Sequence, residues 1–151
     1  FIGRLQSNKI KLLVRYCSEI QTLTEEKHAV MIADQAKANR KTPFPVYLAV
    51  NAGDETQKSG LPLHEVEALY DTIKHLKDLA IQGIMSIPPR DYTDVAYEGK
   101  GLPPLYKELR QVASRIGAGK LSLGMSQDIN LAIAAGSDCL RLGSVIFGER
   151  S

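Results

Sequence analysis

The amino-acid sequence predicts an α/β protein with a parallel sheet, and three observations lead to this fold class. Six short apolar segments typical of strands alternate along the chain with segments in which apolar residues recur at helical spacing. No two of the strand segments are joined by the short Gly- or Asn-containing turn of a hairpin. The run PVYLAV at residues 45–50 is apolar at nearly every position, which is typical of a strand covered by helices on both faces of its sheet.

Two architectures have this alternation, an open doubly wound sheet and the eight-stranded (β/α)₈ or TIM barrel. The usual marks of the open sheet, the GxGxxG fingerprint and the P-loop, do not occur in the sequence. A barrel of roughly 250 residues has about 31 residues in each of its eight βα units, so the 151 residues of this chain correspond to five units and a final strand. We therefore expect a single domain over residues 1–151 that contains about strands 3 to 8 of a TIM barrel, with the first two βα units missing.

The helical segments are recognised by their capping residues and by the spacing of their apolar side chains. Thr22 or Thr24 can cap the second helix, and acidic residues follow in its first turn, where the helix macrodipole favours negative charge. Pro62 suits the first turn of the third helix. The first expected helix covers residues 7–16, and the last covers residues 127–135 and is ended by Gly136. The three helices between them are marked by apolar stripes, which are Ala29, Ile32, Ala33 and Ala36 in the second, Leu63, Val66, Tyr70 and Ile73 in the third, and Leu105, Leu109, Val112 and Ile116 in the fourth. Gly117 is expected at the C′ position of the fourth helix.

The strand segments are short and are bounded by turn-forming residues. Pro88 and Pro89 end the fourth of them, and the polar residues 90–101 that follow are the best candidate for a mobile loop. The expected strands cover residues 1–5, 19–23, 45–50, 79–87, 121–125 and 139–147.

Composition and charge exclude several classes of protein. With 44% hydrophobic and 24% charged residues, the chain is typical of a globular protein and not of a disordered or collagen-like one. The net charge of +2 is too small to indicate nucleic-acid binding, and no apolar run approaches the ~20 residues that span a membrane. Cys17 and Cys139 form no CxxC motif and have no His at metal-binding spacing, so we expect a cytoplasmic protein without a metal site.

The first residues, FIGRLQ, begin inside an apolar stretch without an initiator Met. They lack the basic segment and apolar core of a signal peptide. The expectation is that the chain is a fragment, cut from its upstream context within a strand.

In either architecture the functional residues lie at the C-terminal ends of the strands, and two of these ends carry residues suited to a phosphate. Ser126 lies where a strand leads directly into a helix, and Gly143 and Ser144 lie in the last strand segment. Backbone N–H groups, a hydroxyl and a glycine that permits close approach can together hold a phosphate. The alternative is that Ser126 only caps its helix and Gly143 only relieves packing.

Arg141 interrupts the last apolar strand segment. Burying a guanidinium without a partner is costly, so Arg141 needs an anion or hydrogen-bond acceptors. The simpler interpretation is an ion pair inside the barrel with an Asp or Glu of a neighbouring strand, and the other is contact with a ligand.

Other residues that could take part in chemistry have simpler explanations. Asn8 and Lys9 follow the first strand and Lys58 lies in a loop after a strand, but exposed lysines are usually solvated. Met85 near a strand end could pack against a flat ligand, although Met in a strand is more often part of the core. We expect helix-surface roles for the histidines His28, His64 and His75, and solvated positions for the loop acids Asp91 and Asp94. We expect no Ser-His-Asp, Cys-His or metal-binding set of residues.

Five motifs in order along the chain are similar to one family. They are FIGRLQSNK at residues 1–9, QKSG at 57–60, GIMSI at 83–87, LSLGMS at 121–126 and RLGSVIFGER at 141–150. The chain resembles, over its whole length, the pyridoxal phosphate homeostasis proteins, which are grouped with the alanine racemase N-terminal domain. The resemblance implies a partial TIM barrel of that type that binds pyridoxal 5′-phosphate (PLP) and buffers or delivers it, as part of vitamin B6 homeostasis, without catalysis. It further implies that Ser126, Gly143 and Ser144 hold the phosphate, that Arg141 lies near the pyridine nitrogen or the phosphate, and that Asn8 and Met85 flank the ring.

The resemblance also implies that the lysine forming the Schiff base lies on the first barrel strand, upstream of this sequence. PLP-dependent apoenzymes are then the expected partners, with a monomeric full-length protein and a fragment that self-associates through its exposed sheet edges. Two other functions remain open, a PLP-dependent amino-acid racemase and a partial barrel that binds no ligand. We expect no second domain that could supply the opposed acid–base group of a racemase, which counts against that function.

Overall fold

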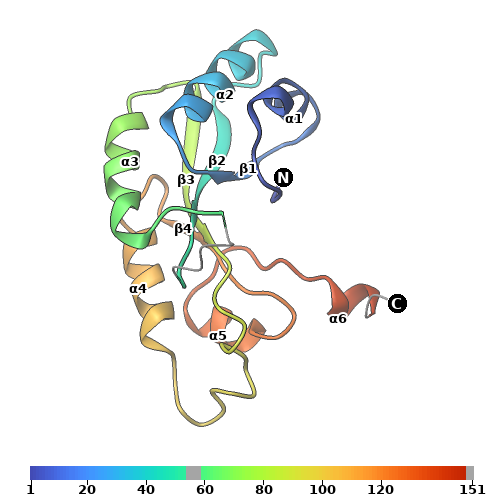
Figure 1. Cartoon of the computed structure of the whole chain (residues 1–151), viewed down its shortest axis with the longest axis vertical. Coiled ribbons are helices and arrows are strands. Elements are labelled where there is room, and N and C mark those ends of the chain that lie inside the picture. Colours follow the sequence, from blue (N-terminus) through green and yellow to red (C-terminus); the bar gives the residue numbers. More distant parts are fainter. Residues whose placement is uncertain (54–58, 149–151) are drawn as a thin grey trace.

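A computed structural model of the chain describes residues 1–53 and 59–148, and its core is a four-stranded parallel sheet (Figure 1). The strands are β1 (Ile20–Leu23), β2 (Phe44–Val50), β3 (Leu79–Ser86) and β4 (Lys120–Ser122). They are hydrogen-bonded in the order β1-β2-β3-β4, so each strand lies beside the next one in the sequence. This order, with helical crossovers between the strands, is that of consecutive βα units of a barrel.

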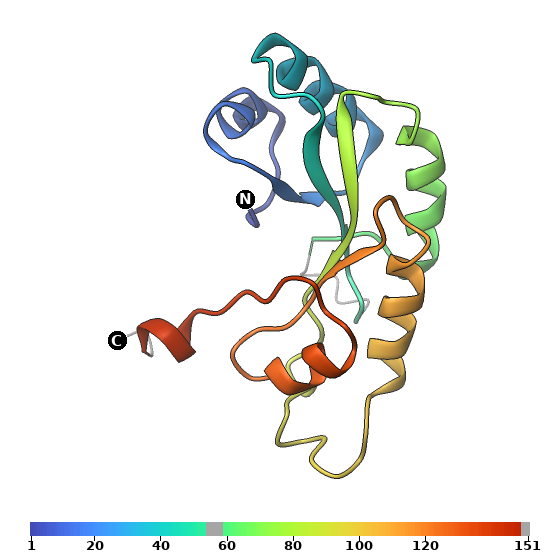
Figure 2. The same ribbon diagram turned by 180° about the vertical axis from the view of Figure 1, so that it is seen from behind.

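The helices between the strands cover one face of the sheet (Figures 1 and 2). The longer ones are α1 (Ile10–Tyr16), α2 (Glu26–Ala38), α3 (Val66–Ile73) and α4 (Pro104–Ala113). Short helices are η1 (Ser7–Lys9), η2 (Leu63–Glu65), α5 (Ile129–Ala134) and α6 (Ser144–Phe147). The predicted stripe of α2 is confirmed, because its four apolar residues are all buried in the core.

The two faces of the sheet have different partners. In β2, Val46 and Leu48 belong to the large core beneath the helices, whereas Tyr47 and Ala49 point to the other face and cluster with Met85 of β3. That other face also carries buried polar side chains of β1 and β4, and a hydrogen bond of 2.7 Å joins Ser122 to Gln21.

This hydrogen bond shows that the sheet is strongly curved. Adjacent strands are about 4.8 Å apart, so β1 and β4 would lie roughly 14 Å apart in a flat sheet, beyond the reach of a Gln and a Ser side chain. The face that carries Gln21, Tyr47 and Ser122 is therefore concave and corresponds to the interior of a barrel. The predicted α/β class and the parallel partial barrel are confirmed.

Short segments extend the sheet at both edges without forming full strands. Phe1 donates its terminal N–H to Glu19 O (2.8 Å) and accepts from Gln21 N (2.9 Å), which is the pairing of a parallel ladder beside β1. On the other side, Cys139 forms a parallel bridge with Ser122. The predicted strand at residues 1–5 is wrong, since Phe1 pairs beside β1 without forming a strand.

The prediction of a strand over residues 139–147 is wrong, because the segment forms only the isolated bridge at Cys139. The chain turns away beyond residue 141, and hydrogen bonds of 2.9 Å from Phe147 N to Gly143 O and from Gly148 N to Ser144 O close the short helix α6. Figures 1 and 2 show α6 standing apart from the other elements. Its apolar side chains, which indicated a strand, are exposed: Val145, Ile146 and Phe147. Without a cover on both faces, an apolar run has no reason to stay in the sheet.

Helix α4 ends four residues before Gly117, so the C′ prediction is wrong. Two successive turns, with Ile116 N bonded to Ala113 O at 3.0 Å, lead the chain back toward the sheet. Gly117 has a φ of 53°, and a Cβ there would collide with the carbonyl group of Ile81 in β3. Glycine is needed at this position for the close approach of backbone to strand.

Candidate functional site

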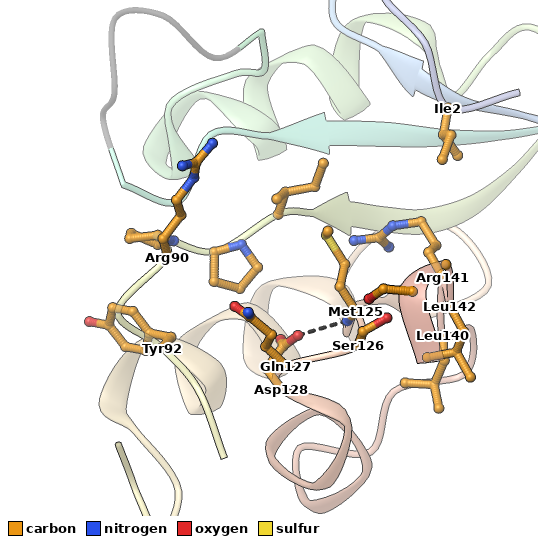
Figure 3. Close-up of a pocket in the computed structure, with 15 residues that line it drawn as sticks. Ile2, Arg90, Tyr92, Met125, Ser126, Gln127, Asp128, Leu140, Arg141 and Leu142 are labelled. Atoms are coloured by element: carbon orange, nitrogen blue, oxygen red, sulfur yellow. Dashed lines mark hydrogen bonds between the residues drawn. The ribbon is translucent and has the colours of Figure 1, made fainter. Parts of the chain in front are cut away.

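A cavity of about 920 Å³ lies at the C-terminal ends of β3 and β4 (Figure 3). Three chain segments form its walls, residues 87–92 after β3, residues 125–128 after β4 and residues 140–144, with Ile2 from the N-terminal segment. Four of the predicted site residues line it: Ser126, Arg141, Gly143 and Ser144.

Ser126 is placed by a sharp turn between β4 and α5. Gly124 enters this turn with a φ of 104°, and a Cβ there would lie 2.5 Å from that of Ala132, so the turn requires glycine. The Ser126 hydroxyl accepts a hydrogen bond of 3.3 Å from Val145 N. The structure thereby brings Ser126 to the segment that contains Gly143 and Ser144, as the phosphate hypothesis requires.

Arg141 has neutral partners only. Its Nη1 donates to Ser122 Oγ (2.7 Å) and its Nη2 to Ser86 O (2.6 Å), both at the concave face. Within residues 1–53 and 59–148 no carboxylate forms an ion pair with it, so the predicted ion pair inside the barrel is not found there. Burial lowers the pKa of the Arg141 guanidinium from its ordinary value, and the charges of Cys139 and Asp128 oppose this shift only in part.

Asp128 is a site residue that the sequence did not reveal. Its carboxylate is buried, with one oxygen accepting from Met125 N (2.7 Å) and the other from the Tyr106 hydroxyl (2.6 Å). Burial and this bond to Asp128 raise the pKa of Tyr106 above its ordinary value. The position of Asp128 two residues after Ser126 was visible, but its partner lies on α4, 22 residues away in the sequence.

Asp94 is bound and not simply solvated, contrary to the prediction for the loop acids. Its carboxylate accepts hydrogen bonds from Asn130 N (3.0 Å) and Leu131 N (2.9 Å) at the start of α5. Its own N–H donates to Gln127 O at 2.8 Å. The N-terminal amides of α5 therefore hold a carboxylate of the chain itself.

The remaining predicted site residues lie elsewhere. Met85 is buried on the concave face and lines a smaller cavity of about 230 Å³, which shares Ile2 and Ile87 with the first. Asn8 is exposed in η1 and is not among the residues that line either cavity, so its contact with a ligand stays a prediction. Lys58 lies outside the described residues.

One cluster resembles a catalytic triad that the sequence did not predict. His28 is buried between Ser7 and Glu25, with its Nε2 2.9 Å from Ser7 Oγ and its Nδ1 2.9 Å from Glu25 Oε1. The helix-surface prediction for His28 is thus wrong. Ser7 lines neither of the two cavities described above, and its contact with His28 links η1 to α2.

The described residues contain no group of three or more His, Cys, Asp or Glu side chains that could hold a metal ion. None of the helices they form is long and apolar enough to cross a membrane.

Known proteins similar to this chain share both its sequence and its fold. The family model of the alanine racemase N-terminal domain matches residues 1–151. The pyridoxal phosphate homeostasis protein of Vibrio cholerae is 38% identical over 99% of this chain and 63% of its own length, and that of Escherichia coli is 35% identical over 99% and 64%. The chain thus spans a little under two thirds of the length of these relatives.

Two solved protein structures share the fold of this chain. A protein of unknown function from Bifidobacterium adolescentis superposes with a TM-score of 0.79 at 30% identity, over 97% of this chain and 59% of that one. PipY of Synechococcus elongatus, solved with PLP bound, superposes with a TM-score of 0.76 at 26% identity, over 98% of this chain and 69% of its own.

Proposed function

Because this chain belongs to the alanine racemase N-terminal domain family, we propose that it is part of a protein that binds PLP and keeps it available, without turning over a substrate of its own. The relatives that carry the name pyridoxal phosphate homeostasis protein, and the PLP-bound structure of PipY, support this proposal. Cofactor-dependent apoenzymes are the partners that such a carrier would supply.

The observation that carries the proposal is the guanidinium of Arg141 beside the cavity. It is held by one hydroxyl and one carbonyl oxygen, and both are neutral. A partly buried cation of this kind is stabilised by an anion that binds in the cavity. A phosphate ester or the phenolate oxygen of a pyridoxal ring supplies such an anion.

The other groups around the cavity suit PLP. Ser126 with the backbone of Gly143 and Ser144 offers hydrogen-bond donors for a phosphate, and an added Cβ at Gly143 would meet no atom within 4 Å, so a ligand can approach its backbone closely. The apolar side chains of Ile87 and Met125 offer faces for a flat ring. When bound, PLP supplies an aldehyde and an electron-accepting ring, and Arg141 near the pyridine nitrogen would keep that nitrogen unprotonated. A ring in this state is a weak electron sink, which suits storage better than catalysis.

Binding can be tested by titrating the protein with PLP, with pyridoxal, which lacks the phosphate, and with inorganic phosphate. The proposal predicts saturable PLP binding, competition by inorganic phosphate and much weaker binding of pyridoxal. Reduction with borohydride followed by mass spectrometry then locates any lysine that PLP modifies. Absence of saturable PLP binding would refute the proposal.

The absence of turnover is tested separately by incubating the PLP-loaded protein with L-alanine and measuring D-alanine by chiral chromatography. Racemisation that rises in proportion to protein concentration would replace the carrier function with that of a racemase.

A further inference from the structure

The turn that carries Ser126 is fixed from inside the protein at both of its ends. At the start of the turn, Met125 N donates to the Asp128 carboxylate at 2.7 Å (Figure 3). At its end, Gln127 O accepts from Asp94 N at 2.8 Å. Ser126 itself lies between these two bonds, so the direction of its hydroxyl and N–H depends on them.

Asp128 is in turn held by Tyr106, which has no exposed surface. The 2.6 Å bond from the Tyr106 hydroxyl fixes the second carboxylate oxygen, so the carboxylate cannot rotate away from Met125 N. The Tyr106 ring also stacks on Tyr92, which lines the cavity, with ring centroids 5.9 Å apart. Helix α4 thus holds the Asp128 end of the turn through a single buried hydroxyl.

The same arrangement limits which donors are left for an anion. Asp94 occupies the amides of Asn130 and Leu131, so the backbone donors left for a phosphate in the cavity are those of residues 126–127 and of the 143–144 segment, beside the Arg141 guanidinium. Any loosening of the turn therefore acts directly on phosphate binding. Pyridoxal makes no phosphate contacts, so its binding depends on the turn only through the Met125 side chain beside the ring.

We propose that Tyr106 and Asp128 are positioning residues of the phosphate site, which hold the Ser126 turn in the geometry that binds a phosphate ester. This inference rests on the proposed function, because it concerns the same cavity. Neither residue needs to touch the ligand, and both act through the Met125–Gln127 backbone.

The test compares affinities for inorganic phosphate, PLP and pyridoxal in Tyr106→Phe and in the control Tyr16→Phe, which removes an exposed hydroxyl on α1. Losing a hydrogen bond to a carboxylate should weaken the binding of phosphate and PLP by about tenfold and leave the affinity for pyridoxal within about twofold. The control should bind all three like the wild type.

A second pair of variants tests Asp128 itself. Asp128→Asn keeps an acceptor for Met125 N and removes a negative charge near the cavity, whereas Asp128→Ala removes the acceptor. If positioning is the role, the Asn variant binds phosphate about tenfold more tightly than the Ala variant. If both variants bind phosphate equally, the acceptor for Met125 N does not affect the site and the proposal is wrong.

The outcomes also separate this inference from the proposed function. If the wild type does not bind PLP, the proposed function fails. If the wild type binds PLP and Tyr106→Phe lowers only the melting temperature, with phosphate affinity unchanged, then Tyr106 is merely structural and the positioning role is refuted. Should Tyr106→Phe fail to fold, the comparison of the two Asp128 variants decides.

Discussion

Replacing Arg141 by Met is the sharpest test of how the cavity works. Met has an unbranched chain of similar reach without charge or donors, so the substitution removes the bonds to Ser122 Oγ and Ser86 O and little else. The Ser122 hydroxyl keeps its bond to Gln21, so this buried group is not left without a partner.

The expected effect on stability is small. Each bond to a charged group is worth about 1.5–3 kcal/mol, but removing the charge also removes the cost of keeping it partly buried without an anion. Because the two terms oppose each other, we expect the free energy of unfolding, measured by urea denaturation, to change by less than about 1.5 kcal/mol.

The expected effect on binding is large. A charge-assisted bond to the ligand that is worth about 1.5–3 kcal/mol corresponds to a loss of affinity for PLP of about 10- to 100-fold. Titration of absorbance or fluorescence with PLP measures it, and Arg115→Met, which removes an exposed arginine paired with Glu67 on the surface, is the control. If Arg141→Met unfolds the protein while its remaining folded fraction binds PLP normally, Arg141 has a structural role and the reasoning fails.

Three further predictions follow from the cavity and the core. Ser126→Ala should weaken PLP binding by roughly 1–3 kcal/mol without changing the affinity for pyridoxal, and equal titration curves for PLP would contradict it. Gly124→Ala should lower the free energy of unfolding by about 3 kcal/mol, because φ is 104° and the added Cβ would lie 2.6 Å from a methyl group of Leu140. The control is the surface variant Gly99→Ala, whose added Cβ meets no atom within 4 Å. It should cost less stability in the same denaturation experiment. Burial, with a smaller contribution from the nearby Glu19 charge, raises the pKa of Tyr47 to about 12. The unfolded chain loses the Tyr47 proton near pH 10, so between pH 10 and 12 the folded state binds more protons than the unfolded state. The free energy of unfolding therefore falls by up to about 3 kcal/mol as the pH rises through this range. Tyr47→Phe should show a shallower fall in stability than the wild type across the same range.

The parts of the fold that could be predicted are those in which local pattern and tertiary environment agree. The run at residues 45–50 is apolar on both faces and is indeed β2, and the apolar spacing of residues 29–36 is the buried face of α2. The run that ends at Phe147 has the same local pattern but no cover, so it leaves the sheet and forms a helix. Sequence pattern reports what a segment could bury, and it does not report whether a partner is present.

The candidate site shows the same limit. Ser126 follows β4, as the rule that parallel strands present their C-terminal ends together predicts. Arg141, Gly143 and Ser144 were expected within a last strand that does not form, yet they line the same cavity. The support for Ser126 comes from Tyr106 and Asp94, which lie 20 and 32 residues before it. Their role depends on how α4 and the loop before it pack against the turn, and no local pattern encodes this contact.

The bonds from Arg141 to Ser122 and from Ser122 to Gln21 also bear on how sequences of this type can diverge. These bonds link a residue beside the cavity to the strand on the opposite side of the sheet, across 120 positions of sequence. A change at position 21 alters the partner of Ser122 and, through it, the orientation of the guanidinium. Substitutions at positions 21, 122 and 141 are therefore expected to be inherited together. A lineage that loses Arg141 becomes free to vary Gln21, although three strands of the sheet separate this glutamine from the segment that contains position 141.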